Sequence, residues 1–111
     1  MERFVKGDVV VLPFPFSDLT DAKKRPALVV ASLEGNDRIL CQITSEIKYD
    51  SYSIKLKKKD FEHGGLKVNS WIRPNRLFTA ETSIVKYKIG SLRKTKIQEV
   101  SDKLCDIFRK E

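Results

Sequence analysis

The sequence predicts a mainly β protein, a small and strongly bent antiparallel barrel with one C-terminal helix. Between Val9 and Ile89 the apolar residues fall into six short runs that turn residues separate, which is typical of short strands. From about Lys94 the apolar spacing changes from two residues to three or four, which indicates an amphipathic helix. A barrel is expected because closure hides the edges of a sheet built from short strands.

Alternating or continuous apolar runs bounded by turn residues define each expected strand. The first run ends at Pro13 and Pro15, because proline cannot donate to a strand ladder. We expect Pro74 and Gly90 to end later strands in the same way, and His63 to Gly65 to form a turn or bulge. The expected strands are 8–13, 26–33, 38–44, 52–56, 68–73 and 85–89.

The last expected element is an amphipathic helix of about four turns. Its apolar residues recur at helical spacing, and the charged residues fall largely on the other side. The apolar face consists of Ile97, Val100, Leu104, Ile107 and Phe108, with Cys105 beside them. Both cysteines, Cys41 and Cys105, lie in apolar patterns and are expected to be buried, reduced thiols.

Length and charge limit the possible functions. The 111 residues fit a single domain, 1–111, and no stretch approaches the ~20 apolar residues of a membrane span. The start of the chain lacks the apolar region of a signal peptide, so we expect a cytoplasmic protein. Lys and Arg number 22 against 15 Asp and Glu, a net charge of +7. This balance favours an acidic partner such as nucleic acid, an acidic protein or an anionic membrane surface, although many small domains are basic for no specific reason.

One pattern suggests chemistry. Arg25 precedes a strand, and Thr44 and Ser45 end the next one, so strand pairing would bring a guanidinium and two hydroxyls together. Such donors suit a phosphate of RNA. A single histidine, His63, and two separated cysteines offer no zinc cluster, so we expect no cofactor and no metal.

The motifs that carry a resemblance run along most of the chain: G-D-V-V-V (7–11), F-P-F-S-D (14–18), K-R-P-A-L-V-V (24–30), I-T-S (43–45), G-L-K-V-N-S-W-I-R-P-N-R-L (65–77) and I-G-S-L (89–92). In this order and spacing the sequence resembles the MazF/PemK family of toxin endoribonucleases from type II toxin–antitoxin systems. The resemblance implies an SH3-like barrel of the CcdB-like superfamily that forms a homodimer. It also implies metal-free cleavage of single-stranded RNA, and inhibition by an antitoxin with an acidic tail.

The resemblance also assigns roles to residues. It makes Arg25 and Thr44 catalytic. At Asn75 the PemK-like branch has an aspartate, and the amide here cannot act as a carboxylate base. The substrate-binding residues expected are Ser45, Phe16, Ser17, Lys24, Arg73 and Asn75.

Structural alternatives stay open for several of these residues. Arg25 could pair with Asp18 or Asp21 on the surface, and Thr44 could cap a turn. The aromatic residues have two interpretations each: Phe14 fits the core, Phe16 fits either the core or a base stack, and Trp71 fits the core or a dimer interface. His63 is expected to be solvated. The alternative function is a non-catalytic module of the same barrel that binds nucleic acid or, like the related gyrase-poisoning toxins, a protein.

Overall fold

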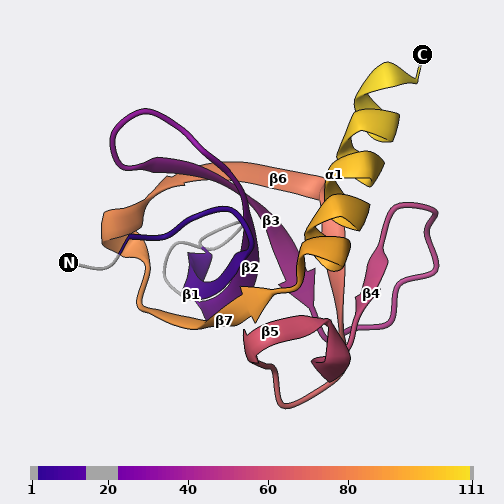
Figure 1. Cartoon of the computed structure of the whole chain (residues 1–111), viewed down its shortest axis with the longest axis horizontal. Coiled ribbons are helices and arrows are strands. Elements are labelled where there is room, and N and C mark those ends of the chain that lie inside the picture. Colours follow the sequence, from indigo (N-terminus) through magenta and orange to yellow (C-terminus); the bar gives the residue numbers. More distant parts are fainter. Residues whose placement is uncertain (1–2, 15–22, 111) are drawn as a thin grey trace.

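The fold is a curled antiparallel sheet of seven strands with one helix, and the computed structural model describes residues 3–14 and 23–110. The strand order is β4-β6-β3-β2-β1-β7-β5 (Figure 1). The helix α1 (Lys94–Arg109) follows the last strand. These elements confirm the predicted mainly β class. The strands are β1 (Asp8–Phe14), β2 (Lys23–Ser32), β3 (Asp37–Thr44), β4 (Ile54–Leu56), β5 (Phe61–Gly64), β6 (Ser70–Glu81) and β7 (Tyr87–Leu92), with short 3₁₀ turns at Lys58–Asp60 and Thr82–Ile84.

Both faces of the central strands are buried. Successive side chains point to opposite faces, so Val9 belongs to one apolar cluster and Val10 to another. The first cluster lies under α1 and includes Leu28 and Ile43. The second includes Phe14, whose ring meets that of Phe78 edge-on at 4.7 Å, which confirms Phe14 as a core residue. Burial on both faces explains why these runs read as continuously apolar.

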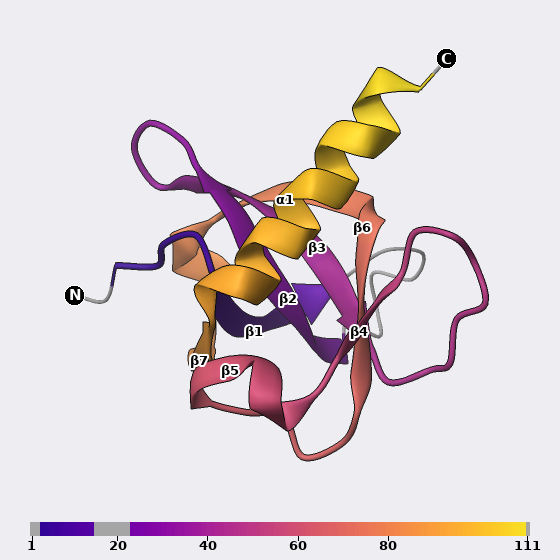
Figure 2. The ribbon, with the colours of Figure 1, turned by 45° about the vertical axis from the view of Figure 1, so that its right-hand side comes forward.

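The helix α1 is attached to the sheet by its first half. Val100 is 1% exposed within the first cluster, and Ile97 and Leu104 pack against that cluster. Gly7 has a positive φ of 99°, and a side chain there would meet Ile97. Figures 1 and 2 show the C-terminal turns of α1 extending away from the sheet, where Phe108 is 69% exposed. The expected apolar face of the helix is therefore only partly covered.

The strand β6 continues past Pro74, so the expectation that Pro74 ends it was wrong. Gln42 of β3 pairs with Arg73, but its neighbour Cys41 pairs with Leu77. Residues 74–76 therefore bulge out of the ladder. A bulged residue makes no hydrogen bond to the neighbouring strand, so a proline, which has no N–H, can lie there without loss.

Other strand ends also differ from expectation. The strand β2 begins at Lys23 rather than Pro26, because Lys23 and Lys24 already pair with β1. The stretch from His63 belongs partly to β5, a strand that was not predicted and that pairs with β7. Gly90 lies within β7, where a side chain would collide with the backbone of His63. Glycine thus permits close strand approach here instead of ending a strand.

The two cysteines have different surroundings. Cys41 is buried, and desolvation raises the pKa of its thiol to about 12. Cys105 is exposed on α1, so the expectation that both thiols are buried was wrong for Cys105. Within residues 3–14 and 23–110, no helix is long and apolar enough to span a membrane.

Candidate functional site

Strand register brings the predicted arginine and hydroxyl together. Ala27 of β2 pairs with Gln42 of β3, and Gln42 also pairs with Arg73 of β6. Arg25 lies two residues before Ala27, and Thr44 two residues after Gln42, so both remain on the same face of the sheet. Arg25, Thr44 and Arg73 therefore come from three neighbouring strands and share one face.

These three side chains line one cavity of about 270 Å³. The described part of the chain contributes four cationic side chains, one carboxylate and two neutral polar side chains to its lining, and no apolar one. Such a composition suits an anion with several oxygen atoms. The described lining residues are Arg25, Gln42, Thr44, Glu46, Lys48, Arg73 and Arg76.

The hydroxyl of Thr44 serves the backbone and still has a proton to donate. Thr44 is 9% exposed, and its Oγ1 accepts a hydrogen bond from the backbone N–H of Glu46 at 3.1 Å. The expected turn cap is thus present. Because a hydroxyl both accepts and donates, the Thr44 proton can still be given to a ligand oxygen.

Arg73 is held by the loop between β3 and β4. Its Nη2 lies 3.6 Å from Oδ2 of Asp50, while its buried Nε has no hydrogen-bond partner in the described part of the chain. Oδ1 of Asp50 accepts the backbone N–H groups of Ser53 at 2.7 Å and Tyr52 at 2.9 Å. The Ser53 N–H above all, then the Tyr52 N–H and the Arg73 charge, hold the pKa of Asp50 below its usual value. The unpaired donor leaves Arg73 under-satisfied, so an anion in the cavity would stabilise it.

The other expected site residues lie elsewhere. Asn75 lines an adjoining cavity of about 160 Å³, which shares Gln42 and Arg76 with the first. Lys24 and Ser45 are exposed and line neither cavity. Phe16 and Ser17 lie outside the described residues, as do Asp18 and Asp21, the alternative partners of Arg25.

Four lining residues were not predicted: Gln42, Glu46, Lys48 and Arg76. Gln42 could have been identified from the sequence, because it is the one polar residue within Ile39–Ile43, an otherwise apolar run. Glu46 and Lys48 follow Thr44 in a loop, where no periodicity indicates direction. Arg76 depends on the β6 bulge. Trp71 is half-buried, with Lys55 Nζ 6.0 Å from its ring centroid, so its expected placement in the core or in a dimer interface stays a prediction.

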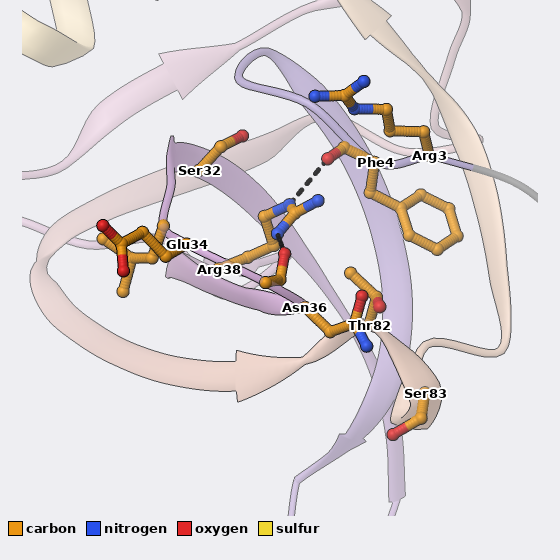
Figure 3. A pocket seen from close by; sticks show the side chains of 10 residues that line it. Arg3, Phe4, Ser32, Glu34, Asn36, Arg38, Thr82 and Ser83 are labelled. Carbon is orange, nitrogen blue, oxygen red and sulfur yellow. Dashed lines mark hydrogen bonds between the residues drawn. The ribbon is translucent and has the colours of Figure 1, made fainter.

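A larger cavity, of about 960 Å³, lies at the other end of β3 (Figure 3). Its charged centre, Arg38, is 7% exposed and donates from Nε to the carbonyl oxygen of Phe4 at 2.7 Å. Nη1 donates to the carbonyl oxygens of Gly35 and Asp37. Arg38 therefore fastens the N-terminal segment and the β2–β3 turn, and we assign it a structural role.

Within the two described ranges, no group of three or more His, Cys, Asp or Glu side chains could hold a metal ion. His63 is exposed on β5 and lines neither of the cavities next to Thr44 and Asn75.

Solved structures with a similar fold include toxins and toxin–antitoxin complexes. MazF from Deinococcus radiodurans matches with a TM-score of 0.77 at 18% identity, over 97% of this chain and 98% of that one. A MazE–MazF structure from the same organism matches with a TM-score of 0.76 at 17% identity, over the whole of both chains. A mycobacterial endoribonuclease in complex with its cognate antitoxin matches with a TM-score of 0.72 at 10% identity, over 96% and 95%. At these identities the likeness shows the fold. No curated protein matches the sequence.

The fold and the cationic cavity thus define a small, mainly β protein with a polar site that suits an anion. Residues 5–108 match the family described as PemK-like, MazF-like toxin of type II toxin–antitoxin systems. Because the match spans nearly the whole sequence, the chain belongs to this family.

Proposed function

We propose that this protein is a toxin that acts as a metal-independent, sequence-selective endoribonuclease on single-stranded RNA. One observation carries the proposal: Arg25, Thr44 and Arg73, from three strands, line a single polar cavity. A protein that only binds nucleic acid needs positive charge, but it does not need an arginine and a buried hydroxyl at one point. Family membership and the fold of solved endoribonucleases support the same activity.

In the proposed reaction the 2′-hydroxyl of a ribonucleotide attacks the adjacent phosphorus. Negative charge grows on the non-bridging oxygens as the phosphorane forms. The planar guanidinium of Arg25 can bind two of these oxygens, and the Thr44 hydroxyl can donate to one of them. Arg73 and Arg76 supply further positive charge for the phosphate or for neighbouring nucleotides. DNA lacks the nucleophile, so the site would not cut it.

We further propose that the chain works as a single-domain homodimer in the cytoplasm and is inhibited by a cognate antitoxin. Several solved structures with this fold are named as complexes with an antitoxin or as MazE–MazF. With a net charge of +7, this chain would attract an acidic antitoxin tail.

The test is to incubate the protein with a long single-stranded RNA in EDTA and to map the fragments. We expect cleavage at a short recurring sequence, with 2′,3′-cyclic phosphate and 5′-hydroxyl ends. An oligonucleotide carrying a single 2′-deoxy substitution at a mapped site should stay intact. Intact RNA with folded protein would instead favour the non-catalytic binding module, and cleavage of the 2′-deoxy substrate would exclude the proposed chemistry.

A further inference from the structure

Among the described residues that line the cavity beside Arg25, one carries a carboxylate, Glu46. The backbone N–H of Glu46 donates to Oγ1 of Thr44, so the start of the loop is fixed to the proposed catalytic hydroxyl. The carboxylate projects outward, 80% exposed, and its Oε2 accepts a hydrogen bond from Nζ of Lys48 at 3.3 Å. A carboxylate has a second oxygen, so Lys48 leaves acceptor capacity for a further donor.

The proposed RNA cleavage, on which this inference rests, needs a group that takes the 2′-proton. Arginine keeps its proton in proteins, so Arg25 and Arg73 do not suit the task. Asp50 does not line the cavity, and its carboxylate is occupied by two backbone N–H groups and Arg73. Asn75 is an amide, which is not a base at neutral pH. Of the lining side chains within residues 3–14 and 23–110, Glu46 alone carries an acceptor that can bind a proton.

We propose that Glu46 is the general base of the reaction. Its free carboxylate oxygen takes the proton of the 2′-hydroxyl while the 2′-oxygen forms a bond to phosphorus. The bond between phosphorus and the 5′-oxygen breaks, and the 5′-oxygen takes a proton from water. The products are a 2′,3′-cyclic phosphate and a 5′-hydroxyl, and no electrons are transferred. The Glu46 proton returns to solvent before the next turnover.

The charge of Glu46 distinguishes a general base from a residue that binds the RNA. A negative group among four cations weakens the attraction of the cavity for a phosphate. Removing the Glu46 charge should therefore leave RNA affinity unchanged or increase it, while the chemical step slows. A residue that merely supported the fold or held the RNA would lose affinity and rate together.

The experiment compares Glu46→Gln with Glu62→Gln. Glu62 is a matched control because it also lies exposed in an ion pair, with Arg93 at 3.4 Å, but on β5 and away from the cavity. Single-turnover cleavage and equilibrium binding would be measured on one single-stranded RNA, with circular dichroism as the check on folding. We expect Glu46→Gln to cleave about 100-fold more slowly, at the lower end of the range for general-base loss. Its RNA affinity should be at least that of the wild type, and Glu62→Gln should match the wild type in both.

Each outcome separates the two proposals. If the wild-type protein leaves RNA intact, the proposed function fails. If the wild type cuts and Glu46→Gln cuts within about threefold of it, the endonuclease stands and Glu46 is not the base. A parallel loss of rate and affinity in Glu46→Gln also overturns the proposal. Glu46→Asp, which keeps a carboxylate, should be faster than Glu46→Gln.

Discussion

Thr44 shows how one side chain can serve both the fold and a reaction. Its oxygen caps the turn to Glu46, and its proton remains available in the cavity. Thr44→Val keeps the shape of the side chain but removes the hydroxyl that caps the turn and donates to the phosphate. We therefore expect cleavage to slow about 100-fold, the effect of losing one hydrogen-bond donor to the transition state. Thr44→Ser restores a hydroxyl and should recover most of the rate. Single-turnover kinetics on RNA would check this, and equal rates for the Val and Ser variants would contradict it.

The two thiols offer a direct test of burial. Cys41 is buried with a pKa of about 12, so at pH 8 only about 10⁻⁴ of it is thiolate, the form that reacts. Cys105 is exposed. We expect a thiol reagent such as Ellman's reagent to modify one cysteine rapidly in the native protein and two in urea. Cys105→Ser should abolish the rapid phase, and rapid modification that survives this substitution would show that Cys41 is accessible.

At the scale of elements, the β3–β4 loop and the β6 bulge together position the arginines of the cavity. Asp50 ties the loop to Arg73 and forms a turn with the backbone of Tyr52 and Ser53. Its pKa is lowered in the folded protein, so the ionised form contributes stability above the usual carboxyl pKa of about 3.9. That contribution is lost as the pH falls through the lowered value.

The corresponding prediction concerns Asp50→Asn. The variant should be less stable than the wild type at pH 7. The difference should shrink as the pH falls below about 3.9, because the carboxyl of the unfolded chain then binds a proton more readily than the folded carboxylate does. Urea unfolding of both proteins at pH 7 and pH 3 measures this difference in the free energy of unfolding. A difference that is the same at both pH values would show that the Asp50 charge does not contribute.

Two apolar side chains of α1, one buried and one exposed, allow a matched pair of substitutions to alanine. Val100 is 1% exposed and Phe108 is 69% exposed on the same helix. Val100→Ala removes buried methyl groups and should lower the free energy of unfolding by about 2 kcal/mol. Phe108→Ala should change it by less than about 0.5 kcal/mol. Denaturant unfolding of both variants would measure these changes. A larger loss of unfolding free energy for Phe108→Ala would mean that the outer turns of α1 are covered in solution.

At the scale of the whole molecule, positive charge should make RNA binding depend on salt. Arg25, Lys48, Arg73 and Arg76 all line the cavity. If each of the four contacts a phosphate, log K should fall with log salt at a slope of about −3, given about −0.7 per contact for single strands. Fluorescence titrations from 50 to 300 mM salt would measure it. A slope near zero would contradict an electrostatic interface.

Much of the fold follows from local patterns, whereas details of the site depend on pairing between distant strands. An apolar run between turn residues predicted β3, and helical spacing predicted α1 from Lys94. The meeting of Arg25 and Thr44 also followed, because both flank strands that pair. The β6 bulge did not follow, since Pro74 ends a strand in one context and lies in a bulge in another. Arg76 was missed for that reason. Glu46 was missed because a turn capped by Thr44 can be expected from the sequence, whereas the direction of the side chains in the loop after it cannot.

The most direct test of the central claim is the rate of single-stranded RNA cleavage in EDTA by the wild type, Arg25→Ala and Arg109→Ala. Arg109 is an exposed arginine at the end of α1 and serves as the control. We predict that the wild type and Arg109→Ala cut equally fast, and that folded Arg25→Ala is slower by 100-fold or more, on the order of the loss of one charge-stabilising donor. An Arg25→Ala protein that cuts RNA as fast as the wild type would contradict the account.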